Sequence, residues 1–138
     1  MCATRTGTSR PAPSPTVAVI DDDPAVRRAM ARMLRNAGVR VASFSSAEEL
    51  LQAYDEVRPA CLVLDFALPG LSGPDLLERL RAVPPAPAAI FVTGRIDAQQ
   101  ALRRRGLGKV PCLQKPFEPA LLVEAVTCAL SAREPAQR

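Results

Sequence analysis

Val17-Ala18-Val19-Ile20-Asp21-Asp22 is the stretch from which the fold of this 138-residue chain can be inferred. A short apolar run stops there at an acidic pair. Such runs, bounded by polar residues, are typical of buried parallel strands when helical patterns separate them. That condition is met here, because Met30, Met33 and Leu34 recur at helical spacing after the acidic pair.

Three further apolar runs also end at a polar residue. They are Cys61–Leu64 before Asp65, Ala88–Val92 before Thr93, and Lys109–Gln114 before Lys115. With a short run over Val39–Phe44, this gives five strands that alternate with helical patterns. The pattern predicts an α/β fold with a five-stranded, doubly wound parallel sheet of flavodoxin-like strand order 2-1-3-4-5. Pro111 favours an edge position for the fifth strand, because proline removes a donor from the strand ladder.

The polar residues that end these runs are expected to share one pocket. In an open parallel sheet, the carboxyl ends of the strands form the ligand crevice. The pocket would hold three carboxylates, one hydroxyl and one ammonium group, from Asp21, Asp22, Asp65, Thr93 and Lys115. Clustered carboxylates raise one another's pKa unless a divalent cation or a lysine neutralises them. Magnesium takes carboxylate and phosphate oxygens, and an aspartate can act as the nucleophile in phosphoryl transfer.

Composition limits the alternatives. The content of 48% hydrophobic and 23% charged residues is typical of a soluble globular domain, and no apolar run approaches the roughly 18 residues of a membrane span. We therefore expect a cytoplasmic location and no membrane contact. The chain has no histidine, which excludes a histidine-dependent triad. Its four cysteines lack zinc-ligand spacing, and Cys61 and Cys128 are expected to be small buried hydrophobic residues.

The expected organisation is one folded domain over residues 16–131 between two short ends. Residues 1–15 are rich in Pro, Ser, Thr and Arg and are predicted to be a disordered leader, and residues 132–138 to be a C-terminal tail. The net charge is +4, and Arg103-Arg104-Arg105 is its longest run. We interpret this run as a solvated helix face and expect no direct nucleic-acid binding, because no recognition helix or zinc finger accompanies it.

The motifs at the strand ends resemble those of the receiver domain of bacterial two-component response regulators. They are Asp21-Asp22, then Asp65 with Leu68-Pro69-Gly70 and Ser72-Gly73, then Thr93-Gly94, and finally Lys115-Pro116-Phe117. The similarity spans about Thr16 to Leu130. The stretch Ser43–Leu50 is most similar to the subgroup that contains the nitrogen-fixation regulator FixJ. The resemblance implies a CheY-like fold and a Mg²⁺-dependent phosphoacceptor.

The resemblance also implies a role for each acidic residue of the pocket. Asp65 would accept the phosphoryl group. Asp22 would hold Mg²⁺ directly and Asp21 partly through water. Asp65 itself and the backbone carbonyl of Ala67 would complete the protein ligands.

Other positions carry implied roles in phosphate binding and switching. Thr93, followed by Gly94, would hydrogen-bond a phosphoryl oxygen, and Lys115 would pair with the carboxylate and then with the phosphate. Pro116 would follow a cis peptide bond. Cys112 stands at the switch position where the family usually has Phe or Tyr, so the usual aromatic switch is absent.

Two other departures lie on the fourth strand-helix connection and its helix. Arg95 places a bulky charge near the mouth of the pocket, which bears on the lifetime of the phosphorylated state. The segment 103–106 carries arginines where small apolar residues are common in the family, which bears on readout.

The leading hypothesis is a phosphorylation-dependent signalling switch and not an enzyme, apart from slow autodephosphorylation. It would receive phosphate from a sensor histidine kinase or a histidine phosphotransfer protein and act on a downstream protein. A homodimer through the face of helix four, strand five and helix five is a further expectation. The alternatives are an unphosphorylated pseudo-receiver and the receiver part of a longer DNA-binding regulator, although the two ends favour a complete short protein. A haloacid-dehalogenase type phosphatase would need a second carboxylate where Ala67 stands.

Overall fold

The computed structural model describes residues 15–133, in which five strands alternate with five helices. The elements are β1 (Thr16–Ile20), α1 (Pro24–Asn36), β2 (Arg40–Phe44), α2 (Ala47–Val57), β3 (Cys61–Asp65), α3 (Gly73–Arg81), β4 (Ala88–Thr93), α4 (Ala98–Arg104), β5 (Cys112–Gln114) and α5 (Pro119–Arg133). All strand pairs are parallel, in the order β2-β1-β3-β4-β5. The predicted fold class and strand order are confirmed. The predicted leader and tail fall almost entirely on residues outside the described range.

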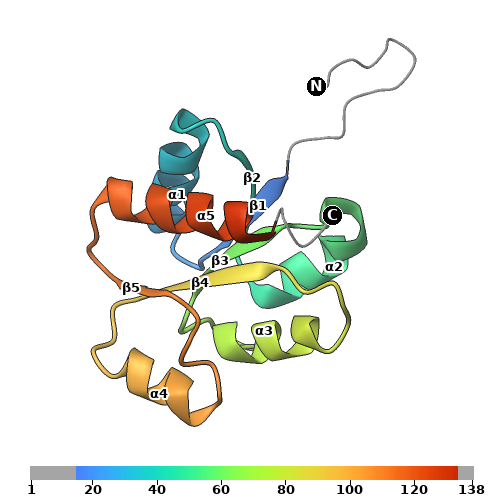
Figure 1. Ribbon diagram of the computed structural model, residues 1–138, viewed down its shortest axis with the longest axis vertical. Coiled ribbons are helices and arrows are strands. Elements are labelled where there is room, and N and C mark those ends of the chain that lie inside the picture. The colour runs from blue at the N-terminus through green and yellow to red at the C-terminus, as the bar shows by residue number, and fades with distance from the viewer. Residues whose placement is uncertain (1–14, 134–138) are drawn as a thin grey trace.

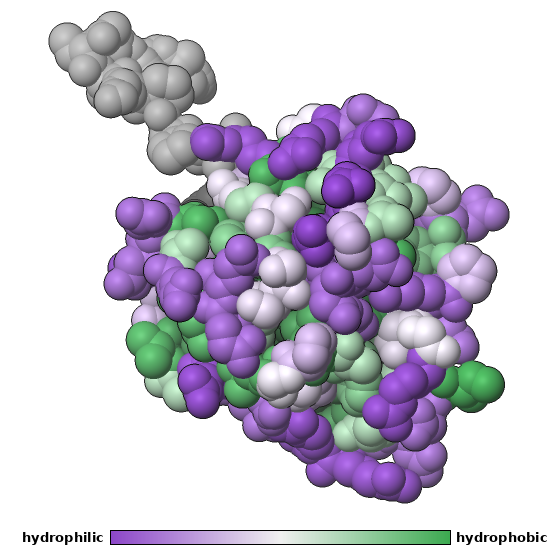
Figure 2. All heavy atoms as spheres, turned by 180° about the vertical axis from the view of Figure 1, so that it is seen from behind, coloured by the Kyte–Doolittle hydropathy of each residue, from purple (hydrophilic) through white to green (hydrophobic). Residues whose placement is uncertain are grey.

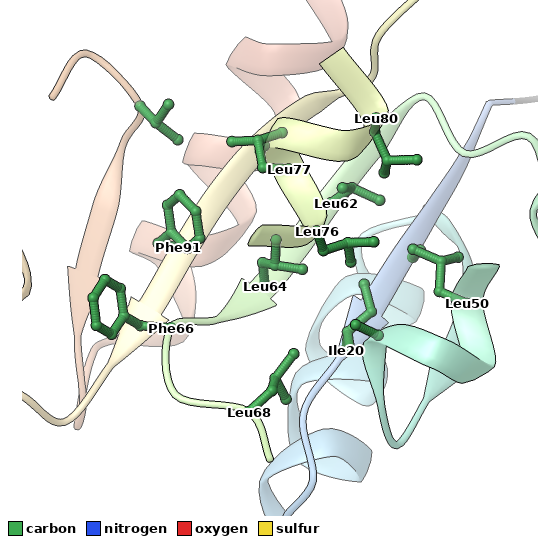
Figure 3. Packing of buried hydrophobic residues seen from close by; sticks show 14 of the residues in the cluster. Ile20, Leu50, Leu62, Leu64, Phe66, Leu68, Leu76, Leu77, Leu80 and Phe91 are labelled. Carbon is green, nitrogen blue, oxygen red and sulfur yellow. The ribbon is translucent and has the colours of Figure 1, made fainter. Parts of the chain in front are cut away.

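The sheet is the middle of three layers (Figure 1). Helices α1 and α5 cover one face, and α2, α3 and α4 cover the other. Successive strand residues point to opposite faces, so Val17 and Val19 pack towards α1 and α5 while Ala18 and Ile20 pack towards the opposite helices. Figure 3 shows the core on the side of α2, α3 and α4, where leucines of α2 and α3 pack against β1 and β3.

The start of α1 follows from the residues at its first turn. Asp23 is the N-cap, and its side chain accepts a hydrogen bond of 2.9 Å from the Ala25 N–H. Pro24 occupies the first helical position, where no backbone donor is needed. Gly38, with φ of +87°, lies just beyond the end of the helix, where this backbone conformation favours glycine. These local signals place α1 directly after the acidic pair.

The cap of α2 is half of a capping box. The Ser46 side chain accepts from the Glu49 N–H at 3.0 Å, as in that motif. The Glu49 carboxylate, however, accepts from the N–H and hydroxyl of Ser45, at 2.6 and 3.0 Å, and not from Ser46. These bonds, first that from the Ser45 N–H, hold the pKa of Glu49 below its ordinary value.

The fifth strand is shorter than the predicted 109–114, because pairing in β5 begins at Cys112. Pro111 precedes the strand, and its carbonyl accepts from the Phe91 N–H at 2.8 Å. The edge position inferred from this proline is confirmed.

The prediction for Cys128 is wrong, because this cysteine is exposed, whereas Cys61 is buried as expected. Helix α5 buries Val126, and two further residues turn the chain by about 200°, which places Cys128 on the solvent side. The helix itself continues to Arg133.

The surface in Figure 2 carries hydrophobic residues scattered among hydrophilic ones, without one broad apolar patch on that face. Among the described residues, no helix combines the length and apolar character needed to span a membrane.

Candidate functional site

The pocket at the carboxyl edge of the sheet contains every buried polar residue in the range 15–133. These residues are Asp21, Asp65 and Thr93, with 0%, 7% and 2% of their surface exposed. Asp21 follows β1, while Asp65 and Thr93 end β3 and β4. Burying an ionisable carboxylate is unfavourable unless it is paired, so this concentration marks the edge as a functional site.

The three acidic side chains meet as the sequence predicts. One carboxylate oxygen from each of Asp21, Asp22 and Asp65 lies within 4.8 Å of the others. Asp22 is exposed, so the cluster opens to solvent on that side. The Lys115 Nζ atom lies 3.0 Å from Asp21 Oδ2 and 3.7 Å from Asp65 Oδ2. One ammonium group therefore neutralises part of the charge of three carboxylates.

Asp65 has a strongly perturbed carboxyl group. Burial, and next the charge of Asp21, raise its pKa from the ordinary 3.8 to about 6. The Lys115 charge and the Ala67 N–H, which donates to Asp65 Oδ1 at 3.3 Å, act in the opposite direction but do not compensate. The low accessibility of the site therefore disfavours the ionised form of Asp65 even with Lys115 close by.

The backbone around Asp21 is fixed by residues of α1. The Asp23 N–H donates to Asp21 Oδ1 at 2.9 Å, and Arg27 Nη1 donates to the Asp21 carbonyl at 2.8 Å. The helix that follows the acidic pair therefore positions one of its carboxylates.

Thr93 and Lys115 are brought together by the pairing of β4 with β5. The Lys115 N–H donates to the Thr93 carbonyl at 2.7 Å. The Thr93 hydroxyl accepts from the Arg95 N–H at 2.9 Å. The Arg95 guanidinium lies 5.1 Å from the centre of the Phe66 ring and forms two bonds with Asp97, of 2.8 and 3.0 Å. The positive charge of Arg95 is therefore paired with Asp97 and lies against the Phe66 ring beside the pocket.

The remaining expected positions lie around this edge. Gly94 is exposed, and no atom lies within 4 Å of where its Cβ would stand. The Lys115–Pro116 peptide bond is cis. Cys112 is partly buried against the cluster under α4, and this burial raises the pKa of its thiol. Ala67 is exposed beside Asp65.

Close packing explains why position 73 is a glycine, which the Ser72-Gly73 motif alone does not. A Cβ at this position would collide with the backbone carbonyl of Asp65, and it would also approach the Phe91 ring to 3.1 Å. The absence of a side chain lets the start of α3 pack on the backbone of the strand that carries Asp65.

Glu48 is the residue near the site that sequence reasoning missed. Its Oε2 atom accepts from the Leu71 N–H at 3.0 Å, which ties α2 to the loop after Asp65. This bond is the main reason why the pKa of Glu48 is lowered. The only local signal was its place in the first turn of α2, which reveals nothing about a partner 23 residues away.

The family model of the response regulator receiver domain matches residues 17–127. The transcriptional regulatory protein FixJ of Azorhizobium caulinodans is 39% identical over 114 residues, which cover 83% of this chain and 54% of FixJ. The chain belongs to the response regulator receiver family, and the predicted class of function, a receiver of two-component phosphorelay signalling, is confirmed. The chain spans about half the length of the curated relatives it matches.

Solved structures agree with this fold. The receiver domain protein from Methanospirillum hungatei JF-1 superimposes with a TM-score of 0.80 at 24% identity, over 90% of this chain and 99% of that chain. The beryllofluoride-activated receiver domain of DrrB, from Thermotoga maritima, gives a TM-score of 0.74 at 28% identity, over 86% and 98% of the two chains.

Proposed function

We propose that Asp65 accepts a phosphoryl group from a phosphohistidine on a separate histidine kinase or histidine phosphotransfer protein. The observation that carries this proposal is the surroundings of Asp65. It is a buried carboxylate beside two other acidic residues and one lysine, in a pocket that opens to solvent past Asp22. Membership of the receiver family supports the same role.

The donor atoms fit a magnesium ion. Three carboxylate oxygens within 4.8 Å are hard ligands, and Lys115 offers one positive charge to these three carboxylates. Asp21, Asp22, Asp65 and the carbonyl of Ala67 would hold the ion. When bound, the ion would supply positive charge for the carboxylates and the incoming phosphoryl oxygens.

The transfer uses the carboxylate of Asp65 as the nucleophile. One of its oxygens bonds to phosphorus, the P–N bond of the donor phosphohistidine breaks, and the electron pair leaves with the imidazole. Lys115 is close enough to follow the negative charge, because its Nζ atom is already shared between Asp21 and Asp65. The Thr93 hydroxyl can donate to a phosphoryl oxygen, since its present bond with Arg95 uses it only as an acceptor.

We infer that the phosphorylated state acts through contacts with a downstream protein, or through a further domain if the chain is part of a longer regulator like its relatives. The homodimer through α4, β5 and α5 and the cytoplasmic location stay predictions. The pseudo-receiver alternative is disfavoured, because all five polar groups of the pocket are present and close together.

The test is phosphorylation by acetyl phosphate with Mg²⁺, followed by intact-mass spectrometry. Wild type should gain one hydroxylamine-sensitive phosphoryl group, and Asp65→Asn should gain none while keeping its fold. Asp55→Asn is the matched control, because Asp55 is exposed on α2 away from the pocket. Undiminished labelling of Asp65→Asn would place the acceptor on another residue.

A further inference from the structure

The loop between β3 and α3, residues 66–72, carries the backbone carbonyl of Ala67 that would hold Mg²⁺. Its two ends are held locally. The Phe66 N–H donates to the Val92 carbonyl at 2.9 Å, and the Gly73 N–H donates to the Phe66 carbonyl at 3.3 Å. The direction in which the Ala67 carbonyl points therefore depends on what holds the middle of the loop.

Glu48 supplies the hydrogen bond that ties the middle of this loop to the fold. Its Oε2 atom accepts from the Leu71 N–H at 3.0 Å, across 23 residues of sequence. Within residues 15–133, no other hydrogen bond joins residues 68–71 to a neighbouring element. The other attachment of this segment is apolar, through Leu68 in the core and Leu71 packed against it. One carboxylate on α2 therefore provides the directional restraint on this segment.

Gly70 lets the Glu48 carboxylate approach the loop closely. The φ of Gly70 is +73°, in the left-handed region that favours glycine. A Cβ at this position would stand 2.8 Å from Glu48 Oε2, closer than a carbon and an oxygen pack without a bond. The loop thus presents an N–H at Leu71 and a bare backbone at Gly70 to the same carboxylate oxygen.

Helix α2 does not need this carboxylate for its own start. The Ser46 hydroxyl and the Glu49 carboxylate already accept from backbone N–H groups there, at 3.0 and 2.6 Å. Glu49 also places a negative charge in the first turn, where the helix dipole favours one. Glu48, by contrast, is exposed, and the N–H of Leu71 outside the helix is the main cause of its lowered pKa. A purely local capping role leaves the bond to Leu71 unexplained.

The chain between Leu71 and Ala67 is short enough to pass on this restraint. Three residues separate the two positions, and one of them, Pro69, has its φ fixed near about −65° by its ring. The burial of Leu68 keeps the loop close to the core, but apolar contacts are non-directional and do not orient a carbonyl. Loss of the bond at Leu71 would therefore free the Ala67 peptide to rotate.

From these contacts we propose that Glu48 is a positioning residue for the metal site. It holds the loop after β3 in the conformation in which the Ala67 carbonyl can join the carboxylates of Asp22 and Asp65 around Mg²⁺. The inference rests on the proposed function, because it concerns the same Mg²⁺ ligands. Glu48 is not one of the carboxylates that meet in the acidic cluster, so it acts through the backbone of the loop. Residues that orient a metal ligand without touching the ion typically change metal affinity by about 10- to 100-fold.

The experiment uses two substitutions that separate the hydrogen bond from the charge. Glu48→Ala removes the acceptor, whereas Glu48→Gln keeps a side-chain oxygen for the Leu71 N–H and removes only the charge. Glu49→Ala is the matched control, because it removes a carboxylate of the same helical turn that bonds to Ser45 and not to the loop. Calorimetric titration measures Mg²⁺ affinity, and NMR in EDTA measures exchange of the Leu71 amide hydrogen. Labelling by acetyl phosphate is followed at increasing Mg²⁺ concentration.

We expect Glu48→Ala to weaken Mg²⁺ binding by about 10-fold and to speed up exchange of the Leu71 amide hydrogen. Glu48→Gln and Glu49→Ala should both stay near wild type. At saturating Mg²⁺, Glu48→Ala should be labelled by acetyl phosphate at close to the wild-type rate, because Asp65 and its polar neighbours are unchanged. Loss of fold stability alone would not be rescued by Mg²⁺ in this way.

Equal Mg²⁺ affinity for Glu48→Ala and wild type would overturn the inference. An equal loss of affinity in Glu48→Gln would assign the effect to charge, and an equal loss in Glu49→Ala would assign it to the stability of α2, so either result would also overturn it. A wild type that binds Mg²⁺ but gains no phosphoryl group would refute the proposed function alone, and the comparison of Mg²⁺ affinities would still decide the role of Glu48.

Discussion

Burial raises the pKa of the Asp65 carboxyl, so the protonation of this group is linked to folding. Its pKa in the fold is about 6, whereas an exposed aspartate has 3.8. The fold therefore prefers the neutral carboxyl, which contributes stability below about pH 4 that is lost as the pH rises through 6. Without metal at pH 7, the ionised group costs on the order of 2–3 kcal/mol.

We accordingly expect Asp65→Asn to raise the free energy of unfolding at pH 7 in EDTA by roughly that amount, on the order of 2 kcal/mol. At pH 4 the gain should nearly vanish, because the wild-type carboxyl is then mostly neutral in the fold. Urea unfolding followed by circular dichroism across this range measures both. A gain that is the same at pH 4 and pH 7 would contradict the raised pKa.

A substitution at Asp22 tests the proposed Mg²⁺ ligands without removing the phosphoacceptor Asp65. Because its carboxylate is exposed at the open side of the cluster, Asp22→Ala should leave the fold intact. We expect it to weaken Mg²⁺ binding by about 10-fold or more, since a hard cation loses one of its charged ligands. Asp97→Ala is the control, because Asp97 pairs with Arg95 outside the cluster. Calorimetric titration with Mg²⁺ compares the two variants, and equal losses of Mg²⁺ affinity would reject Asp22 as a ligand.

Between helices, Arg105 is the main polar link of α4 to the rest of the fold. Its Nη2 atom lies 2.6 Å from Asp75 Oδ1 and 2.8 Å from Glu78 Oε1, both on α3. Hydrogen bonding to Arg105 lowers the pKa of Asp75. Helix α4 itself buries only Ala98 and Leu102, so this polar link matters for its order.

Arg105→Gln should therefore loosen α4 more than it destabilises the domain. The pairs are partly exposed, so we expect a loss of unfolding free energy below about 1 kcal/mol that shrinks at high salt. Amide hydrogen exchange in α4 should speed up relative to α3 and β4. Arg104→Gln is the matched control, because Arg104 is exposed and forms no ion pair within the described residues. Uniformly faster exchange in all elements would argue against a local link.

The elements that sequence predicted well are those with local causes. Asp23, Pro24 and Gly38 set the ends of α1 through their own backbone preferences. The strand order places the carboxyl ends of β1, β3, β4 and β5 at one edge of the sheet, so the pocket residues could be predicted from the sequence.

The features that the sequence did not predict depend on contacts between distant segments. Glu48 reaches Leu71 and Arg105 reaches Glu78, and no spacing in the sequence announces either partner. The burial of Cys128 was misjudged because one apolar residue in an apolar helix does not reveal which side faces the sheet.

Across the domain, the pairing of β4 with β5 connects the strand end that carries Thr93 with the strand that carries Cys112. Phe91 lies opposite Cys112 in that pairing, and Thr93 lies opposite Gln114. Phe91 is fully buried and makes an edge contact with Phe66, at 6.2 Å between ring centres (Figure 3). Position 112, where the family usually carries an aromatic ring, holds a partly buried cysteine.

A cysteine is too small to fill the space of such a ring or to expose a comparable surface when it turns outward. We therefore expect activation to move Thr93 and the loops after β3 and β4, where Glu48 and Arg95 make their bonds, but to change little at Cys112. Solution NMR spectra of wild type and Cys112→Phe, each with and without Mg²⁺ and beryllofluoride, measure this. In wild type the shifts should centre on residues 66–71 and 93–97, and in Cys112→Phe they should extend to β5 and α5. A large shift centred on Cys112 in wild type would show that the thiol is itself the switch, and readout through the two loops would have to be abandoned.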